Sequence, residues 1–441
     1  MARSKEELKK IACAAIDAKR QELITLGDSI FSEPELGFKE VKTAAKIKKI
    51  FDELSFAYTD GVALTGIIAP RKGKESKIKV AVMGEMDAVV APNHRFADPK
   101  TGAAHSCGHN CMIAGLIGVA YALKDTGIME ELSGDVVLMA VPAEEYVEIG
   151  YRNQLRKEGK ISLLGGKQEF IQLGVMDDID MMVMQHNFPT EGETPSPIKA
   201  GPGGGSNGFV GKLIEYVGKE AHAGGAPHDG KNALNAANIG LMAVNAQRET
   251  FKDEDHIRVH PIITKGGDLV NVVPADVRVE TYVRGATVDA ILSASEKVNR
   301  AFRAGGYAID VETNITELPG YLPTIVNKNL QHLMAANLVT LFGEDKVIRE
   351  MASGAASTDA GDVSHLMPTI QAKIGGSAGT PHSSNYEILD KDLAYLGAAK
   401  ALVMTVIDLL ADGAAEGLRI KAEFQPAMTK AQYLKDWGKL S

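Results

Sequence analysis

The sequence has few of the features that mark secreted, nucleic-acid-binding or aromatic-rich proteins. Its 441 residues include three cysteines, Cys13, Cys107 and Cys111, which is an odd and sparse set that cannot form a disulfide framework and favours a reducing compartment. There is no run of Lys and Arg, and the formal net charge is −9, so we expect no nucleic-acid partner. Aromatic residues are only 5% of the chain, so composition does not indicate an aromatic-lined pocket.

Long apolar runs are also missing. No stretch reaches the roughly 18 uninterrupted apolar residues of a membrane span, and the first ten residues, MARSKEELKK, are too charged for a signal peptide. We therefore expect a cytoplasmic protein that does not bind membranes. The 45% apolar and 24% charged residues are ordinary for a globular protein, and a chain of this length is expected to form two domains.

Short apolar runs alternate with helical patterns in the first half of the chain. An amphipathic helix is predicted at 5–33, strands at 79–84, 135–141 and 180–185, and a helix at 110–124. This alternation indicates an α/β domain with a mixed, mostly parallel sheet. Polar residues follow each predicted strand, and ligands of open α/β sheets bind beyond the carboxyl ends of the strands. We therefore expect these polar residues to converge.

The pattern changes at the glycine-rich run 201–205. This run lacks the Gly-Lys-Ser/Thr ending of a phosphate-binding loop, so it is interpreted as a linker. The following residues are predicted to form strand, helix, strand, strand, helix and strand, which is typical of a compact α+β sandwich. Since residues suited to catalysis resume after it, we predict a domain at 206–320 inserted into a larger domain formed by 1–205 and 321–441.

Two short motifs carry residue types suited to metal chemistry. Cys107 and His109 flank Gly108 at the predicted start of a helix, where Gly permits a tight backbone and the helix N-terminus favours the thiolate that binds metal. Glu144 and Glu145 directly follow a predicted buried strand, where adjacent carboxylates are costly unless a cation or a metal offsets them. Taken alone, each motif is also compatible with ordinary buried or exposed side chains.

Two further histidines stand near the ends of predicted strands. His186 lies in the run QHNFP, and His382 lies in the run GTPH. A single histidine is more often a structural residue than a ligand, and the spacing of these four groups does not make a local metal motif. Their shared position after strands is the reason to expect that they converge.

Eight short runs occur in the order found in a known family: GEMDAV, HSCGHN, PAEE, HNFP, KEAHAG, NVVPADV, ASTDAGDVS and GTPH. In this order, over about residues 35–400, the chain resembles the carboxypeptidase-G and aminoacylase family of two-metal amidohydrolases, peptidase family M20. Its branch with Cys-Gly-His is most similar. Asn110, together with the run at 357–364, is closest to the B-subunit type of aminobenzoyl-glutamate hydrolases.

The resemblance implies a binuclear centre that holds two divalent metal ions per subunit, Zn²⁺ or Mn²⁺. The metal ligands that it implies are Cys107, His109, Glu145, His186 and His382. Glu144 matches the general base of the family, and Asp87 matches an aspartate that orients a ligand histidine.

In the family, the inserted domain serves as a lid and in dimerisation. His222 matches the histidine that stabilises the oxyanion, and Asn271 and Arg284 match positions that contact the substrate. Two departures stand out. Glu85 occupies the position of a histidine ligand in other branches, so that ligand is taken as absent, and the stretch 146–172 is longer than usual and is expected to shape the pocket.

The function implied is a metal-dependent amidohydrolase or metallopeptidase. Its expected substrate is a small N-acyl amino acid, an aminobenzoyl-glutamate-like compound or a dipeptide, and a homodimer or larger homo-oligomer is expected. Two alternatives remain open: a hydrolytic deaminase of an aromatic amine on the same site, and a non-catalytic homologue that acts as an assembly subunit. Against the second, every ligand position of the Cys-Gly-His branch is present.

Overall fold

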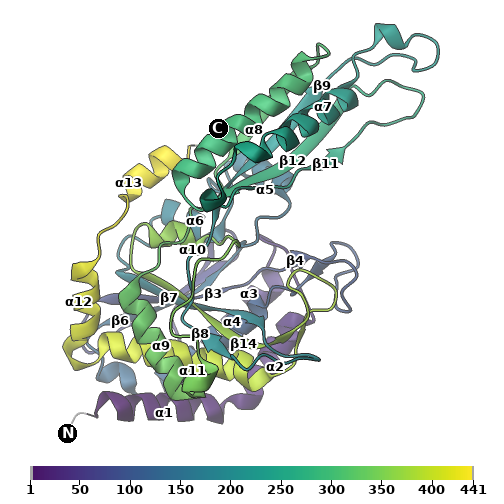
Figure 1. Ribbon diagram of the computed structural model, residues 1–441. Helices are drawn as coiled ribbons and strands as arrows, with labels where there is room; N and C mark the ends of the chain where they lie inside the picture. Colours follow the sequence, from purple (N-terminus) through teal and green to yellow (C-terminus); the bar gives the residue numbers. More distant parts are fainter. Residues whose placement is uncertain (1–2, 440–441) are drawn as a thin grey trace. The chain divides into compact units, whose positions relative to one another are not determined.

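The computed structural model describes residues 3–439, and this part of the chain divides into two compact units (Figure 1). The first unit contains the residues up to Gly205, Ile325–Ala352 and Asp362–Lys430. The second contains Ser206–Thr324, Ser353–Gly361 and the residues from Ala431 onward. Its longest segment corresponds to the insertion expected at 206–320, and the two shorter segments were not indicated by the sequence pattern.

An eight-stranded sheet forms the centre of the first unit, with the order β1-β2-β6-β3-β7-β14-β15 and with β8 beside β14. The strands are β1 (Thr59–Val62), β2 (Gly66–Arg71), β3 (Lys79–Glu85), β6 (Asp135–Val141), β7 (Met181–Pro189), β8 (Ala200–Gly201), β14 (Thr369–Ala378) and β15 (Glu387–Ile388). The adjacent strands β6, β3, β7 and β14 run parallel, and the other pairs are antiparallel. The predicted mixed α/β class is therefore confirmed. A separate pair, β4 (Val89–Val90) and β5 (Ala103–Ala104), lies outside this sheet.

The helices of the first unit surround this sheet. They are α1 (Lys5–Ala18), α2 (Arg20–Phe31), α3 (Val41–Glu53), α4 (His109–Asp125), α5 (Ile149–Lys157), α6 (Gly166–Gln172), α9 (Lys328–Phe342), α11 (Ala398–Leu410) and α12 (Ala415–Glu423), with the short helices α10 (Ala360–Ser364) and α13 (Lys430–Gln432) at its boundaries with the second unit. The single helix predicted at 5–33 is wrong: Lys19 has φ −101° and ψ 18°, which ends α1 and lets the chain turn into α2.

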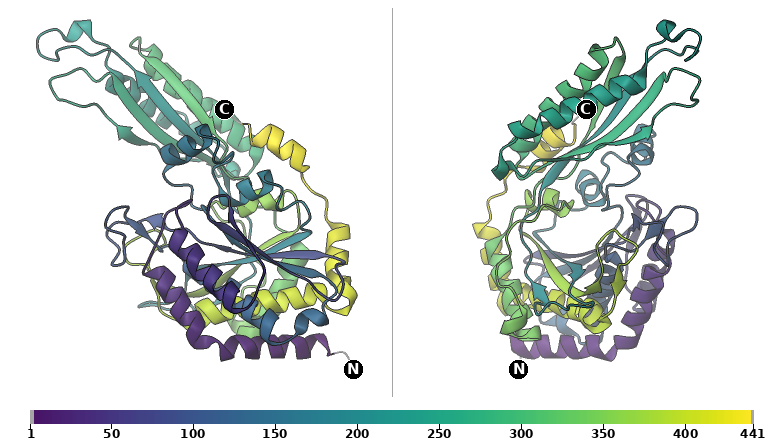
Figure 2. Two further views of the ribbon diagram at one scale, coloured as in Figure 1. Left: turned by 180° about the vertical axis from the view of Figure 1, so that it is seen from behind. Right: turned by 45° about the vertical axis from the view of Figure 1, so that its right-hand side comes forward.

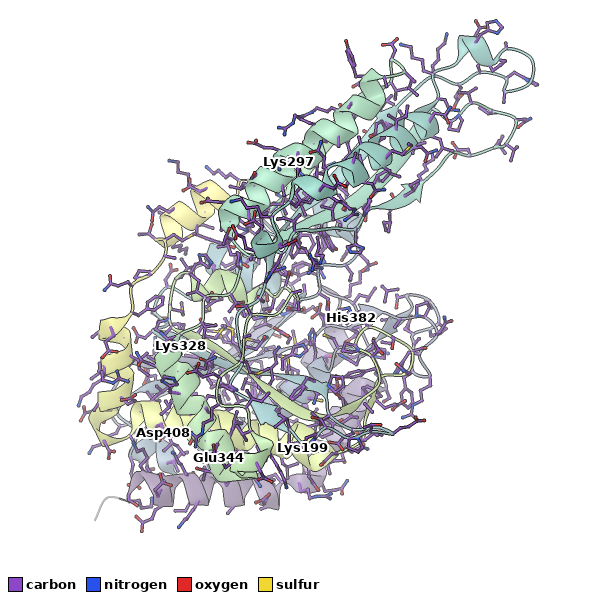
Figure 3. The ribbon with its side chains drawn as sticks, viewed as in Figure 1. Lys199, Lys297, Lys328, Glu344, His382 and Asp408 are labelled. Atoms are coloured by element: carbon purple, nitrogen blue, oxygen red, sulfur yellow. The ribbon has the colours of Figure 1, made fainter. Side chains whose placement is uncertain are left out.

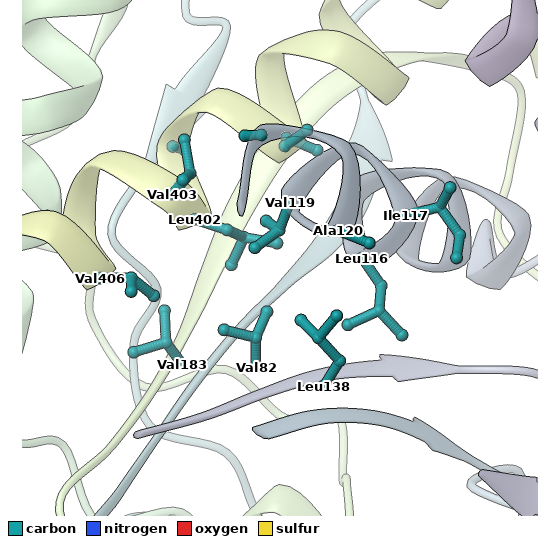
Figure 4. Packing of buried hydrophobic residues seen from close by; sticks show 14 of the residues in the cluster. Val82, Leu116, Ile117, Val119, Ala120, Leu138, Val183, Leu402, Val403 and Val406 are labelled. Atoms are coloured by element: carbon teal, nitrogen blue, oxygen red, sulfur yellow. The ribbon is translucent and has the colours of Figure 1, made fainter. Parts of the chain in front are cut away.

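Two apolar helices, α4 and α11, form the layer against one face of the sheet. Their packing is visible in Figure 4, where the labelled side chains include Leu116, Val119, Leu402, Val403, Val406, Val82, Leu138 and Val183. The helices α1 and α2 cover this layer from outside (Figure 2). A helix that is apolar on all sides belongs inside a protein, and α4 is buried continuously from His109 to Leu123.

The stretch Asp392–Leu410, which ends in α11, is long and apolar enough by composition to cross a membrane. In this protein 89% of its most apolar window is buried against other parts of the chain. A core helix of a globular domain passes the same test, and the packing of α11 between α1 and the sheet is of that kind.

The second unit contains a five-stranded antiparallel sheet with the order β10-β12-β9-β13, in which β11 also pairs with β12. Its elements are β9 (Gly208–Val217), α7 (Ala233–Ala246), β10 (Arg258–Val259), β11 (Ile262–Lys265), β12 (Asp276–Gly285), α8 (Val288–Tyr307) and β13 (Glu312–Leu318). Two strands were expected between the two helices of this unit, but three are observed, because β10 and β11 are separate. Pro261 lies between them and has no N–H to donate to a sheet.

The packing of α4 against α11 gives a testable prediction at Gly118. A Cβ added there would lie 2.4 Å from the Ala399 Cβ, whereas one added at Gly115 would lie 3.4 Å from the Ala398 Cβ. We expect Gly118→Ala to lower the free energy of unfolding by about 1–3 kcal/mol, because overpacking forces the helices apart. Gly115→Ala serves as the control and should be neutral or stabilising by up to about 1 kcal/mol. Urea denaturation measures both, and equal effects would contradict the close approach.

Candidate metal centre

The ligands predicted in the first unit come together beyond the carboxyl ends of the parallel strands. Cys107 Sγ lies 3.3 Å from His186 Nε2 and 3.3 Å from His382 Nε2, and His382 Nε2 lies 3.2 Å from Glu145 Oε1. The ligand atoms of Cys107, His109 and His186 all lie within 4.8 Å of one another, and so do those of Cys107, Glu145 and His382. Cys107 belongs to both groups, as a thiolate shared by two ions would.

Hydrogen bonds direct two of these imidazoles toward the centre. His109 Nδ1 lies 2.9 Å from the backbone oxygen of Asp87, and His186 Nδ1 lies 2.6 Å from that of Asn187. A carbonyl oxygen can only accept, so each Nδ1 carries the hydrogen. The neutral His186 presents the lone pair of Nε2, whereas nearby negative groups outweigh burial and raise the pKa of His109 well above its usual value, so His109 presents this lone pair only after it loses a proton. His109 Nε2 and Glu145 Oε1 are buried and make ion-pair contacts, at 3.1 Å with Glu85 Oε2 and at 3.2 Å with His382 Nε2, but neither forms a hydrogen bond of good geometry. Sulfur, nitrogen and oxygen donors arranged in this way fit divalent ions such as Zn²⁺ or Mn²⁺.

The charges around the centre move the pKa values of its residues in different directions. Burial lowers the pKa of His186 well below its usual value, and the Lys373 ammonium acts in the same direction. The carboxylate of Glu145 raises the pKa of His382 to about 11. Burial alone would raise the pKa of Glu145, but His382 lowers it to about 2. His186 is thus neutral and ready to bind, while His382 must lose a proton first.

The backbone at Gly108 places Cys107 and His109 on either side of the start of α4. Gly108 has φ +87°, and an added Cβ would lie 2.5 Å from the Tyr386 hydroxyl and 2.9 Å from the Asn187 Cβ. A residue with a side chain would therefore be both strained and crowded there. His382 comes from a different place in the chain, the loop between β14 and β15; Figure 3 labels it well away from Asp408 of α11.

Glu144 and Glu145 follow a tight turn after β6. Ala143 has φ +54°, which a non-glycine residue adopts only when its surroundings hold it. Glu40 Oε1 accepts from the Ala143 N–H at 2.8 Å, and the carboxylate of Asp87 accepts from the N–H groups of Glu144 and Glu145 at 3.1 and 2.9 Å. These hydrogen bonds fix the direction of both glutamates. Asp87 Oδ1 also lies 3.3 Å from the Nδ1 of His109, a predicted ligand.

Sequence reasoning missed Arg152, which lies in α5 and is 1% exposed. Its guanidinium donates to the backbone oxygen of Ala143 at 2.9 Å, to that of Leu164 at 2.7 Å and to that of Glu145. The long stretch 146–172 is therefore tied to the turn that carries the two glutamates. No local motif marks Arg152, because its partners lie 7 to 12 positions away in the chain.

The residues predicted in the inserted domain lie in the second unit. His222 is exposed, and its Nδ1 accepts from the N–H of Gly225 at 2.9 Å and from that of Gly224 at 3.2 Å. The hydrogen of the neutral ring is therefore on Nε2, where it can be donated. The Asn271 backbone oxygen accepts from the Ala223 N–H at 3.0 Å, which keeps the two loops together.

Arg284 lies on β12, within the second unit. Its Nη1 donates to the Ser357 hydroxyl at 2.8 Å, and the guanidinium lies over the rings of Phe209 and Tyr282 at 5.3 and 5.4 Å. These contacts hold the side chain in one place. The roles of His222, Asn271 and Arg284 toward a substrate remain predictions.

A prediction on pH follows from the burial of Glu40. Burial and the Asp87 carboxylate raise the pKa of Glu40 to about 7 from its usual 4.5. A raised carboxyl pKa costs no stability below 4.5 and an increasing amount as the pH rises toward 7. Glu40→Gln keeps an acceptor for the Ala143 N–H, so we expect it to be more stable than the wild type at pH 8 by roughly 1–3 kcal/mol.

Urea denaturation of both proteins at pH 4.5 and pH 8 measures the effect, which should shrink toward zero at the lower pH. Glu53→Gln, on the exposed side of α3, is the control and should change nothing at either pH. A Glu40→Gln protein that is less stable than the wild type at pH 8 would show that the ionised carboxylate is stabilising.

A second prediction concerns Arg152. A lysine ends in one nitrogen, which cannot occupy the separate positions of Nη1 and Nη2, so Arg152→Lys leaves at least one buried acceptor without a partner. We expect the free energy of unfolding to fall by roughly 2–4 kcal/mol. Lys157→Met, at an exposed position of the same helix, should change it by less than about 0.5 kcal/mol. If the two variants had the same thermal midpoint, Arg152 would not hold the turn.

The chain is similar in sequence to known proteins over most of its length. The family model described as Peptidase family M20/M25/M40 matches residues 81–407. The Xaa-Arg dipeptidase of Mus musculus is 28% identical over 459 aligned residues, which cover 97% of this chain and 95% of the relative.

Two solved structures share the fold. A dinuclear metal binding peptidase from the M20 family of Bacillus subtilis has a TM-score of 0.62 and 21% identity, covering 89% of this chain and 99% of its own. The aminobenzoyl-glutamate utilization protein from Klebsiella pneumoniae has a TM-score of 0.64 and 16% identity, covering 90% and 96%. The branch closest to aminobenzoyl-glutamate hydrolases stays a prediction, since this likeness shows the fold alone. The family match spans most of the chain and includes every predicted ligand, and the chain belongs to peptidase family M20/M25/M40, whose members are hydrolases of carbon–nitrogen bonds.

Proposed function

We propose that this chain hydrolyses the amide bond of a dipeptide or a small N-acyl amino acid with two divalent metal ions. The observation that carries the proposal is the Cys107 thiol, which two groups of ligand atoms share. The full-length similarity to a dipeptidase supports a substrate that releases an amino acid. The dinuclear site named for a structure with the same fold supports the number of ions. Nothing observed favours a deaminase or a non-catalytic subunit.

The two ions would be held by the two groups described above. Cys107, His109 and His186 would bind one ion, and Cys107, Glu145 and His382 would bind the other. When bound, two such ions lower the pKa of a water molecule and polarise the amide carbonyl that it attacks. The donor atoms suit Zn²⁺ and also Mn²⁺.

Glu144 is placed to move the proton. Its side chain is 8% exposed, its Oε2 lies 3.8 Å from His109 Nε2, and its backbone N–H is fixed by Asp87. It takes a proton from the attacking water and gives it to the leaving nitrogen as the amide bond breaks. Transfer of this kind contributes about 10²–10⁴-fold to the rate. The neighbouring Glu145 binds metal in this proposal.

The second unit supplies the substrate contacts in this proposal. His222 carries its hydrogen on Nε2 and donates it to the oxyanion, and donors of this kind are worth about 3–4 kcal/mol. Asn271 and the Arg284 guanidinium bind the carboxylate on the leaving side of the substrate.

Self-association belongs to the same proposal. The unit exposes several large apolar side chains, Met242, Ile262, Ile263, Leu269 and Val270, which a homodimer or a larger homo-oligomer would cover. The unit would then act both as a lid and as the surface of association.

Glu144→Gln tests the proton transfer. We expect it to keep two equivalents of metal and to lose at least 10²-fold in kcat, because the amide cannot accept a proton. Elemental analysis of the purified protein gives the metal content. Hydrolysis of dipeptides with C-terminal arginine, N-acetyl amino acids and aminobenzoyl-glutamate, with and without chelator, gives the activity and the substrate class.

Glu158→Gln, at the exposed end of α5, is the control and should retain the wild-type rate. A Glu144→Gln enzyme that retained more than about a tenth of the wild-type rate would exclude Glu144 as the base. A wild-type protein that binds no metal after reconstitution would overturn the proposed function as a whole.

A further inference from the structure

Glu85 stands where other branches of the family have a histidine ligand, and the sequence therefore predicts that this ligand is absent. It ends β3, it is 0% exposed, and its two oxygens have different surroundings. Oε1 accepts from Lys167 Nζ at 2.5 Å, and Lys167 is also 0% exposed. Oε2 has no hydrogen-bond partner and lies 3.1 Å from His109 Nε2.

The contact between Glu85 Oε2 and His109 Nε2 requires either a proton on His109 Nε2 or a metal ion between the two atoms. His109 donates its Nδ1 hydrogen to the Asp87 backbone oxygen, so a neutral His109 directs a lone pair at a carboxylate oxygen. Two such buried acceptors repel each other unless a proton or a metal ion lies between them. Atoms bound to one ion at about 2.0–2.2 Å lie about 3–3.5 Å apart, and the observed 3.1 Å agrees.

We propose that Glu85 is a sixth protein ligand of the metal centre, which binds the same ion as His109 through Oε2. Glu85, His109 and Glu144 form a third group of ligand atoms within 4.8 Å of one another, and it shares His109 with the group of Cys107 and His186. The inference rests on the proposed two-metal function and adds a residue to it. Each ion would then have one carboxylate ligand, but the ion at His109 would have four protein ligands and the ion at His382 three.

Lys167 explains how the site tolerates another carboxylate. It lies in the first turn of α6, next to Gly166, where an added Cβ would lie 1.7 Å from the Pro142 backbone oxygen. The close packing at Gly166 therefore fixes Lys167 beside the turn after β6. The ammonium holds Oε1 and offsets the charge of Glu85, so that Oε2 remains available to the ion. Lys167 is a positioning residue in this account.

Metal titration of the apoprotein tests the proposal with a readout other than activity. Glu85→Gln keeps an oxygen for Lys167 but places a neutral amide beside His109 Nε2. Calorimetry with Zn²⁺ should show two equivalents for the wild type. The variant should bind one equivalent with the wild-type affinity and the other at least tenfold more weakly, which is about 1.4 kcal/mol. The absorption of bound Co²⁺, which reports the ligands of each ion, should change for one ion only.

Asp408→Asn is a matched control. The side chain of Asp408 is 5% exposed and lies 2.7 Å from that of Lys9, which is 10% exposed, so the variant also turns a carboxylate beside a largely buried lysine into an amide. It lies far from His382 in the first unit (Figure 3). We expect Asp408→Asn to lower the thermal midpoint and to bind two Zn²⁺ with wild-type affinities.

The outcomes separate the two proposals. If Glu85→Gln binds both ions as the wild type does, Glu85 is not a ligand, while the two-metal function stands. If the wild type itself binds no ion, both proposals fall. Should Glu85→Gln not fold, Glu85→Asp keeps the charge but draws the oxygen back by about one bond length. It should fold and lose at least tenfold in affinity for one ion, and full affinity for both would overturn the inference.

Discussion

Five carboxylates, those of Glu40, Glu85, Asp87, Glu144 and Glu145, are at most 8% exposed around the ends of β3 and β6. Each would be expensive to bury alone, and together they repel. The compensation comes from three sources: backbone N–H groups, the buried cations of Arg152 and Lys167, and the divalent ions that we propose. Removing any one source leaves charge without a partner, so folding of this region and metal binding are coupled.

The α/β scaffold makes such a concentration of charge possible. Parallel strands end at the same edge of a sheet, so residues more than 200 positions apart in the chain, such as Cys107 and His382, can meet there. The apolar layer of α4 and α11 lies against the sheet and holds the start of α4 in place, and with it His109. The polar site is therefore supported by a core that is almost entirely aliphatic.

Local pattern was enough for the strands, and the family resemblance supplied the candidate ligands. The predicted strand 135–141 is β6 as observed, and the structure brings together Cys107, Glu145, His186 and His382, which the resemblance implied as ligands. The contacts of Arg152 and Lys167 could not be predicted from the sequence, because their partners come from separate elements. The distinct roles proposed for Glu144 and Glu145 depend on the left-handed turn at Ala143, and an alanine in the sequence does not predict such a turn. Glu85 was discounted by comparison with other branches, although its surroundings give it a possible ligand role.

Arg152 also changes how the stretch between Glu145 and β7 has to be regarded in evolution and engineering. Surface loops usually tolerate insertion and deletion because few contacts depend on their length. Here a helix of the long stretch supplies the cation that holds three carbonyl oxygens around the turn that carries Glu144 and Glu145. A graft from a relative with a shorter loop would remove that cation along with the loop, so loop exchange in this protein has to bring a replacement charge with it.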